Sequence, residues 1–451
     1  MIEGAPIDCG RDLDAKIVSR ADIVVVGGGP AGLSAAVAAA RSGASVTLVE
    51  RYPYLGGLAS GGMVLVLDDM VNGSEITVRG LCHEMIERLE RLGLAVYPPE
   101  SERGYDPVMF RKWFRWGAFD FHVRTRPKPI CYAAAFDPDG WKRVSSDLIR
   151  ESGVELRLHS WFTRTIIDGD RAAGVVCHTK AGPQAVLGTV VIDATGDLDV
   201  AASAGAPFSH GHYIVTTVFR LGGVDTDEAE RFQFEEPARF QELDRRAKQA
   251  IGGCWENWWL KTPLPGIVWC NCPHMPDLDG LKVEDLTEAE FEGRRRIYAL
   301  VDFVRANMPG FENCYVVDVA PQTGIRQTRL LDGEYVVTKE DIVDRIHFPD
   351  SVARGRDYYT PYRALLPKRI DQLLVAGRHY SATSQAQKIS REIPPCMAMG
   401  EAAGVAAAMA LEANSLVRGL DVIELQRRLR ARGADPGDRP SANARVLETQ
   451  S

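Results

Sequence analysis

The chain has 451 residues, 45% of them hydrophobic and 25% charged, and 53 basic against 61 acidic residues give a formal net charge of −8. This composition is typical of globular proteins, and the length suggests roughly three structural units of ~150 residues. It excludes collagen-like, coiled-coil and wholly disordered chains. The acidic balance disfavours nucleic acid as a partner. Nine cysteines are too sparse for a disulfide scaffold, so we expect a reduced, cytoplasmic setting.

The N-terminal region contains one segment that is long and uncharged enough to be considered as a membrane span. Residues 1–20 mix acidic and basic side chains without an apolar stretch, so we expect no signal peptide. Residues 23–40 are eighteen uncharged positions, which is long enough for a membrane helix. Three consecutive glycines and a proline interrupt them, and a turn between a strand and a helix explains these residues better. We therefore expect no membrane span.

The same segment carries the most informative pattern of the chain. Residues 22–26 (DIVVV) predict a buried parallel strand, and GGGPAG follows at 27–32. An alanine-rich helix is expected from about 31 to 42, and a second strand at 45–49 ends in Glu50. This order of strand, glycine turn, helix, strand and acid is typical of a dinucleotide-binding unit.

Each glycine of this turn has a physical role in that interpretation. Gly27 permits the tight turn, Gly29 lets the backbone approach a pyrophosphate, and Gly32 lets helix and strand pack closely. The helix N-terminus faces the phosphate charge, and Glu50 is placed to bind a ribose. A second glycine-rich loop at 51–62 favours a longer cofactor than NAD. Two further predicted strand ends, ATGD at 194–197 and AGR at 376–378, place glycines where a sheet meets its ligand.

Together these features make the chain resemble the FAD-dependent oxidoreductases that share the fold of glutathione reductase and the fumarate reductase flavoproteins. The resemblance also rests on GGLASGG (56–62), GIRQTR (324–329), PYRALLP (361–367) and SREIPPCMAMGEAAG (390–404). These motifs span nearly the whole chain. They specify fold and cofactor well and substrate poorly, because one such scaffold hosts many reactions.

The resemblance implies an α/β fold: a Rossmann-like FAD-binding domain of the glutathione reductase type, with a central parallel sheet and an inserted α+β substrate or cap domain. The FAD-binding domain would be discontinuous, at 21–75, 141–205 and 360–451. Residues 76–140 and 206–359 would form the cap, and residues 1–20 an N-terminal extension. Aromatic side chains crowd 105–121 and 254–269, where they either pack the cap or line a pocket; the latter stretch contains Trp255, Trp258, Trp259 and Trp269.

The resemblance also implies roles for individual residues in binding FAD. Glu50 would hold the adenosine ribose, the backbone at Phe162 would meet the adenine, and a helix at 395–411 would aim its N-terminal end at the flavin ring. We expect non-covalent FAD, because residues 55–60 lack the tethering histidine of fumarate reductase flavoproteins. The expected cofactor-binding residues are Gly27, Gly29, Pro30, Ala31, Gly32, Glu50, Arg51, Gly57, Leu58, Gly61, Gly62, Phe162, Ala194, Thr195, Gly196, Gly377, Arg378, Arg391, Pro394 and Met397.

No metal site is expected. Cys270, Cys272 and His274 are close in sequence, but a structural zinc needs four ligands and the other cysteines are scattered. The C-x-x-x-x-C pair of disulfide reductases is also absent near the first motif.

The expected chemistry is hydride transfer between FAD and a small polar organic substrate, with an unknown electron acceptor. The protein must position the reacting carbon and handle a proton. The catalytic candidates are His379, Tyr380, Arg391, Arg326 and Arg363. The arginines would clamp a polar group such as a carboxylate, or bind the cofactor phosphates. Alternatives are an NAD(P)H-driven monooxygenase, a non-redox use of FAD, and an electron-transfer subunit. A homo-oligomer remains open.

Overall fold

The structure is a computed structural model that describes residues 15–121, 123, 127–254 and 257–446. Residues 1–14 of the expected N-terminal extension and Trp255 lie outside this part of the chain. The rest of the extension is not separate from the fold, because strand β1 (Lys16–Val26) starts within it. The first residues of β1 pair with Gln184 and Ala185. This early start of the strand is not visible in the sequence as an apolar run.

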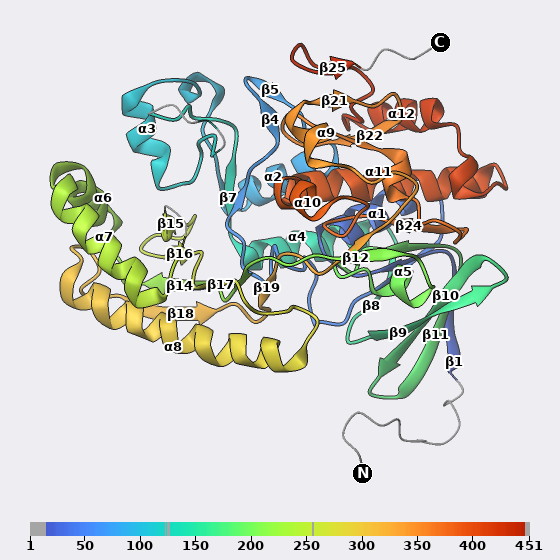
Figure 1. The fold of residues 1–451 in the computed structure, drawn as a ribbon, viewed down its shortest axis with the longest axis horizontal. Coiled ribbons are helices and arrows are strands. Elements are labelled where there is room, and N and C mark those ends of the chain that lie inside the picture. Colours follow the sequence, from blue (N-terminus) through green and yellow to red (C-terminus); the bar gives the residue numbers. More distant parts are fainter. Residues whose placement is uncertain (1–14, 122, 124–126, 255–256, 447–451) are drawn as a thin grey trace.

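The largest sheet has seven strands and lies at the right of Figure 1, in the order β8-β2-β1-β11-β10-β9, with β24 also beside β11. β8, β2, β1, β11 and β24 are parallel, and β9 and β10 add an antiparallel meander. It is therefore a mixed α/β sheet with a parallel centre. The bounds are β2 Val46–Val49, β8 Glu155–Arg157, β9 Trp161–Asp168, β10 Arg171–Thr179, β11 Gly182–Asp193 and β24 Leu373–Val375.

Alternate side chains of β1 enter two different hydrophobic cores. Ile23 and Val25 are fully buried on the face covered by helices α1 (Pro30–Ala40) and α11 (Ile393–Glu412). Val24 and Val26 point to the opposite face, beneath the meander and helix α5 (Asp199–Ser203). Because successive side chains of a strand alternate, a run that is apolar throughout fits a strand covered on both sides.

Helices α1 and α11 pack against each other at backbone distance. A Cβ on Gly400 would lie 2.0 Å from the Ala31 carbonyl oxygen, and one on Gly404 would lie 2.2 Å from that of Ala35. Only glycine allows this approach. It sets the two helices side by side in the same direction, with the start of α1 at Ala31 level with Gly400, the eighth residue of α11.

Helix α2 (Leu81–Arg91) belongs to the same core as α1, α4 (Pro138–Glu151) and α11, although its residues fall in the segment expected to form the cap. The backbone N–H of Leu81 donates to the Glu401 carboxylate of α11 over 3.0 Å. Burial raises the pKa of Glu401 to about 7. A carboxylate from one helix thus caps the N-terminus of another.

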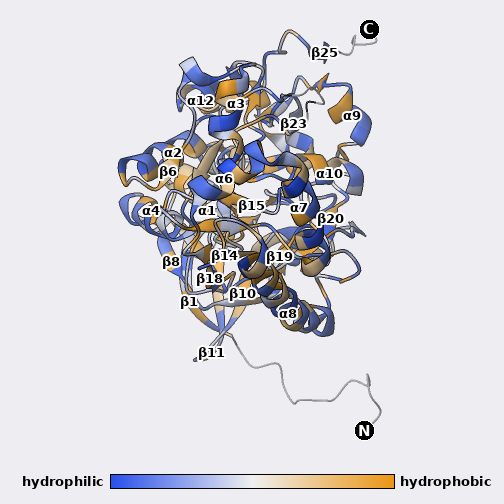
Figure 2. Cartoon of the chain, turned by 90° about the vertical axis from the view of Figure 1, so that its left-hand side faces the viewer, coloured by the Kyte–Doolittle hydropathy of each residue, from blue (hydrophilic) through white to orange (hydrophobic). Residues whose placement is uncertain are grey.

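A second core lies at the left of Figure 1, away from the large sheet. It joins a four-stranded sheet, ordered β15-β16-β14-β18, to three helices. Trp258 and Trp259 are fully buried there against Phe311, so these tryptophans pack a core. Hydrophobic and hydrophilic residues alternate along α8 (Figure 2). The bounds are β14 Phe219–Gly222, α6 Thr226–Glu235, α7 Pro237–Ile251, β15 Trp259–Lys261, β16 Val268–Cys270, α8 Val283–Asn307 and β18 Tyr315–Val319.

Shorter elements connect these parts. Small sheets pair β3 (Val66–Leu67), β7 (Ala134–Phe136) and β6 (Ala95–Val96); β4 (Val71–Asn72) and β5 (Glu75–Ile76); β17 (His274–Met275), β13 (Val215–Thr216) and β19 (Gly324–Ile325); β12 (Phe208–His210) and β20 (Arg329–Leu331); β21 (Ile346–His347) and β25 (Arg445–Val446); and β22 (Ser351–Arg354) and β23 (Tyr359–Pro361). The remaining α-helices are α3 (Pro107–Phe114), α9 (Lys339–Val343), α10 (Ser384–Ser390) and α12 (Val422–Ala431).

Among the described residues, one helix is long and apolar enough to cross a membrane by length and composition. It is α11, and 89% of its apolar window is buried inside the protein. Packing against α1 and the sheet accounts for this composition.

Replacing Gly404 by alanine should destabilise the protein by about 1–3 kcal/mol, because the new methyl group overlaps the Ala35 carbonyl oxygen and forces α1 and α11 apart. Thermal melting followed by circular dichroism measures the effect. Gly419→Ala is the matched control, since a Cβ there meets nothing within 4 Å. Equal melting temperatures for both variants would show that the helices are not in backbone contact.

Candidate functional site

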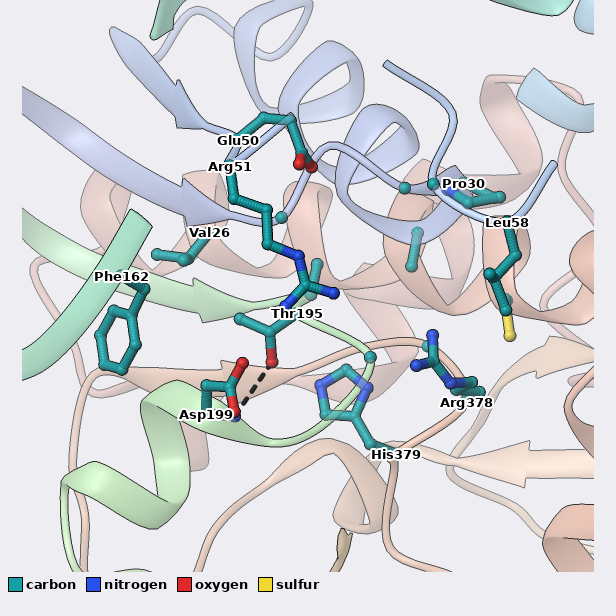
Figure 3. Close-up of a pocket in the computed structure, with 18 of the residues that line it drawn as sticks. Val26, Pro30, Glu50, Arg51, Leu58, Phe162, Thr195, Asp199, Arg378 and His379 are labelled. Carbon is teal, nitrogen blue, oxygen red and sulfur yellow. Dashed lines mark hydrogen bonds between the residues drawn. The ribbon is translucent and has the colours of Figure 1, made fainter. Parts of the chain in front are cut away.

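A cavity of about 710 Å³ opens at the carboxyl ends of the parallel strands. This is where open α/β sheets bind ligands. Figure 3 shows Phe162 at one end of the view, Leu58 and Arg378 at the other, and Thr195 and His379 between them. The site is therefore elongated, and its lining comes from segments that are far apart in sequence.

The glycine-rich turn after β1 forms one wall of this cavity. Gly27 has φ +102°, which favours glycine, and a Cβ on Gly57 would lie only 2.9 Å from Gly29 Cα. The loop at 56–58 therefore lies directly on the turn. Gly32 does not line the cavity; a Cβ there would overlap the Gly27 carbonyl oxygen at 1.7 Å. Its role is the close helix–strand packing that the sequence predicts.

Glu50 lies at the end of β2 with its carboxylate fixed from two sides. One oxygen accepts the Gly28 N–H over 2.6 Å and the other accepts the Tyr52 N–H over 2.8 Å. Burial raises the pKa of Glu50 above its usual value, while these two N–H groups oppose the shift. The carboxylate lines the cavity in the position expected of a ribose-binding acid.

Arg51 and two aromatic residues form the neighbouring wall. The Arg51 guanidinium lies 5.0 Å from the Tyr52 ring centre and 5.6 Å from that of Trp161. It is also 3.8 Å from the Asp197 carboxylate. Cation–π contacts and this ion pair hold a positive charge toward the cavity, where it suits a phosphate.

A buried aspartate organises the strand end of β11. Asp193 accepts hydrogen bonds from the Thr195 hydroxyl and the Ala201 N–H, and its Oδ1 lies 3.2 Å from His379 Nε2. Burial alone raises the pKa of Asp193, but His379 and the donors outweigh it, so the pKa lies below its usual value. Thr195 also accepts the Asp199 N–H, the dashed line in Figure 3.

His379 is fully buried except where it meets the cavity, and its Nδ1 has no hydrogen-bond partner among the described residues. Because Asp193 fixes the other ring nitrogen, the imidazole is oriented with one nitrogen left for a ligand. Arg378 beside it donates to Asp197 over 2.9 Å.

The far end of the cavity is lined by residues that precede α11. Arg391 and Glu392 lie 3.3 Å apart, and the Arg391 Nε is buried without a partner in the described chain. Arg326 faces them from the loop after β19. Ile393 and Cys396, on the first turn of α11, complete this end, so the positive end of the helix dipole points into the cavity.

Most of the sequence-predicted cofactor residues come together here. The cavity is lined by Gly27, Gly29, Pro30, Ala31, Glu50, Arg51, Gly57, Leu58, Phe162, Ala194, Thr195, Gly196, Gly377, Arg378 and Arg391. Gly61 and Gly62 instead support the loop from beneath, against Tyr54 and Leu58. Pro394 and Met397 are buried in the packing of α11, because helical periodicity turns their neighbours Ile393 and Cys396 to the cavity.

The structure separates the five catalytic candidates. His379, Arg326 and Arg391 line the cavity. Tyr380 does not: it is buried, and its hydroxyl is 2.7 Å from that of Ser390. Arg363 also lies elsewhere, paired on the surface with Asp350 at 2.8 Å. Neither of these two residues is placed to touch a ligand of the cavity.

Several lining residues were not identified from the sequence. Arg329 lies within the GIRQTR motif and pairs with Asp199 at 2.9 Å, and Gln322 comes just before that motif. Arg329 is the last residue of a motif that the sequence did single out and Gln322 stands two positions before it, so the motif and its flanks were the available signal. The other missed residues are Val26, Val49, Tyr52, Val64, Ser160, Trp161, Thr163, Asp199, Ala202, Ser203, Phe208, Glu392, Ile393 and Cys396.

The described residues contain no group of three or more His, Cys, Asp or Glu side chains arranged to hold a metal ion. Cys270 and Cys272 are buried in the core of the β14–β18 sheet, and burial raises the pKa of both thiols well above the usual value. Such thiols pack as small apolar groups.

The cavity residues fit a dinucleotide such as FAD. A Cβ on Gly29 would meet only Gly57 Cα, at 3.9 Å, so this glycine leaves the backbone of the turn open to the cavity, and Glu50 supplies the ribose-binding carboxylate. Arg51 supplies charge for a pyrophosphate. The unpartnered Nδ1 of His379 and Nε atoms of Arg378 and Arg391 are buried polar groups that need a ligand or water to satisfy them.

Short stretches of curated proteins are similar to this chain. Residues matched with the cytochrome-type fumarate reductase of Shewanella frigidimarina are 49% identical over 59 positions, or 12% of this chain and 10% of that protein. A thiamine thiazole synthase of Aeropyrum pernix is 40% identical over 80 positions, or 18% of this chain and 27% of that protein. The alignments thus span about a tenth to a quarter of these relatives.

Solved structures match over far more of the chain at lower identity. A geranylgeranyl bacteriochlorophyll reductase-like protein of Thermoplasma acidophilum is 15% identical, with a TM-score of 0.46 over 92% of this chain and 84% of that one. The myxobacterial chondrochloren halogenase is 13% identical, with a TM-score of 0.49 over 92% and 79%. The L-amino acid deaminase of Proteus myxofaciens is 12% identical, with a TM-score of 0.46 over 90% and 93%.

The sequence profile described as "FAD dependent oxidoreductase" matches residues 22–357 and 354–429, which is most of the chain. These matches cover the glycine turn, Glu50, the strand ends that carry His379 and Arg378, and helix α11. The chain therefore belongs to the FAD-dependent oxidoreductase family, and it is an enzyme whose cofactor is FAD.

Proposed function

We propose that this enzyme transfers a hydride between a small polar organic substrate and non-covalently bound FAD. The observation that carries the proposal is the continuity of one cavity, from the dinucleotide turn at Gly27 to the end lined by Arg326 and Arg391. FAD supplies the hydride chemistry when it is bound. The chain's own residues must therefore hold the substrate at the far end and manage its proton.

In this proposal His379 moves the proton. Its Nε2 is bonded to Asp193, and its Nδ1 is buried without a partner in the described chain, in a residue that lines the cavity. An imidazole held by a carboxylate is suited to accept or donate a proton at the free nitrogen. Arg326 and Arg391 would orient the substrate's polar group.

The architecture in this proposal is of the glutathione reductase type, with a cap built around β14–β18 and α6–α8. Their separate hydrophobic core supports this division. A monooxygenase driven by NAD(P)H is the second candidate, because the same FAD-binding scaffold can host either reaction. Against it stands the sequence, which has one dinucleotide fingerprint and no second one for a nicotinamide.

A substrate screen that follows anaerobic bleaching of the bound flavin tests the main proposal. Organic acids, amines and alcohols form the panel. Bleaching by one of them, without oxygen and without NAD(P)H, supports hydride transfer from that compound. A panel of unsaturated acceptors, added to protein reduced with dithionite, tests the reverse direction.

The purified protein should be yellow, and the cofactor that it carries should be FAD, not FMN. Acid precipitation should release this cofactor, since no histidine or cysteine stands in residues 50–62 to tether it. Glu50→Ala should weaken FAD binding by about 1–3 kcal/mol, because a buried acceptor for the ribose is lost. Mass spectrometry of the released cofactor and fluorescence titration of the apoprotein measure these outcomes. Glu50→Gln, which keeps one acceptor, should lie between the wild type and Glu50→Ala. Colour retained in the acid pellet would contradict non-covalent binding.

His379→Ala should slow flavin reduction by the substrate about 10²–10⁴-fold, the usual contribution of a positioned acid or base. Stopped-flow absorbance under anaerobic conditions measures the rate, and the flavin-to-protein ratio shows whether FAD stays bound. Tyr380→Phe is the control, because that hydroxyl is bonded to Ser390 away from the cavity. If His379→Ala reduces at the wild-type rate, the proton is handled elsewhere.

NADPH and NADH should bleach the flavin slowly or not at all. The physical reason is the single dinucleotide fingerprint, whose turn is expected to hold FAD. Anaerobic stopped-flow mixing with either nucleotide measures this. Reduction at the rate of turnover would reject the prediction and favour the monooxygenase.

A further inference from the structure

Arg326 differs from the other arginines of the cavity in its partners. One of its Nη atoms donates to the Thr216 hydroxyl over 3.1 Å and to the Asn271 side-chain oxygen over 3.0 Å. Both acceptors are neutral, and so is His274, whose Nε2 lies 3.5 Å from the same Nη atom and whose pKa is lowered to about 3 by burial and by the charge of Arg326. Within the described part of the chain, no carboxylate lies within 4.0 Å of this guanidinium.

Every other arginine of the cavity has an acid beside it. Arg51 and Arg378 share Asp197, at 3.8 and 2.9 Å. Arg329 pairs with Asp199 at 2.9 Å, and Arg391 lies 3.3 Å from Glu392. A charge withdrawn from water is costly unless it is paired, so Arg326 stands out as the cavity arginine without a carboxylate in direct contact.

Further positive charges surround the same end of the cavity. The Arg391 guanidinium lies 5.7 Å from the ring centre of Tyr213, and the Lys388 ammonium lies 4.8 Å from it. Burial, and then the charge of Arg391, lower the pKa of Arg326 to about 10. At neutral pH the group is still charged, so the excess of positive charge persists. Glu392 faces Arg391 and is the carboxylate that partly offsets the lowered pKa of Arg326. Asp68 also interacts with Glu392 and Arg391, but burial raises its pKa to about 8, so its carboxyl is largely neutral at pH 7.

The partners of Arg326 lie outside the dinucleotide-binding unit. Thr216 is on β13 and Asn271 directly follows β16. Arg51, next to Glu50 at the end of β2, already supplies positive charge for a pyrophosphate. The charge of Arg326 is therefore available for a ligand group other than the FAD pyrophosphate.

From this arrangement we infer that the substrate carries an oxyanion, a carboxylate or a phosphate, which binds to Arg326 with the help of Arg391. The inference rests on the proposed function, because it assigns the substrate class of that same site. Two guanidinium groups offer several fixed N–H donors, which match the oxygens of such a group and give short, charge-assisted hydrogen bonds. An oxyanion supplies the negative charge that Arg326 lacks.

The test is binding, measured by isothermal titration calorimetry on the FAD-loaded protein at constant ionic strength. The probes are sodium acetate, sodium malonate and inorganic phosphate, with sodium chloride as the reference and malonamide as the neutral analogue of malonate. Binding of a carboxylate alone assigns a carboxylate substrate, and binding of phosphate alone assigns a phosphorylated one. If no oxyanion binds better than chloride, or if malonamide binds as well as malonate, the inference is wrong.

Variants locate the binding group. Arg326→Gln should weaken oxyanion binding about 10–100-fold, as expected when a charged hydrogen-bond donor is lost. Arg326→Lys, which keeps the charge, should weaken oxyanion binding less than Arg326→Gln does. Arg363→Gln is the matched control: it removes an arginine whose pair with Asp350 is half-exposed and outside the cavity, so affinity should not change.

The flavin content and the melting temperature of each variant distinguish a specific loss of oxyanion binding from a loss of FAD or of the fold. An Arg326→Gln protein that keeps FAD and melts normally but loses oxyanion binding supports it. A variant that binds the oxyanion as the wild type does, or that loses FAD, overturns it, because Arg326 would then serve the cofactor or neither ligand. Oxyanion binding that depends on Arg326, together with a failed screen for hydride transfer, would refute the proposed function and leave this site intact.

Discussion

The whole site depends on how closely two stretches of backbone can approach each other. At Gly400 and Gly404 helix α11 touches α1, and at Gly57 a loop touches the turn after β1. A methyl group at any of these positions would separate elements that share the wall of the cavity. Because protein interiors are close-packed, such a displacement is transmitted to the side chains that the elements carry. Glycine here determines geometry more than it provides flexibility.

A second constraint is electrostatic. Three aspartates lie within seven residues at the end of β11, and each meets a basic partner: Asp193 meets His379, Asp197 meets Arg378 and Asp199 meets Arg329. These pairs connect the end of β11 to the segment after β24 and to β20. Buried carboxylates without such partners would be strongly destabilising. The acids thus fix the orientation of basic side chains before any ligand arrives, which reduces the entropy lost on binding.

The sequence allowed the glycine turn and Glu50 to be predicted residue by residue, because one local motif contains them and fixes their spacing. Lining residues from other segments, such as Trp161, Thr163 and Asp199, were missed. The substrate end of the cavity could not be predicted from a local motif either. Arg326 and Arg363 stand in equally distinctive motifs, yet only Arg326 reaches the cavity. Which one does so is decided by tertiary packing between segments more than 100 residues apart, and no local pattern records it.

The placement of β24 has a consequence for how the protein is made. This strand pairs with β11, although Leu373 lies about 180 residues after the end of β11 in the chain. His379, Arg378 and the first turn of α11 all follow it. A ribosome-bound chain therefore exposes a finished glycine turn long before the opposite wall of the cavity exists. Contacts so distant in sequence make folding slow, so cofactor capture is deferred until synthesis is nearly over.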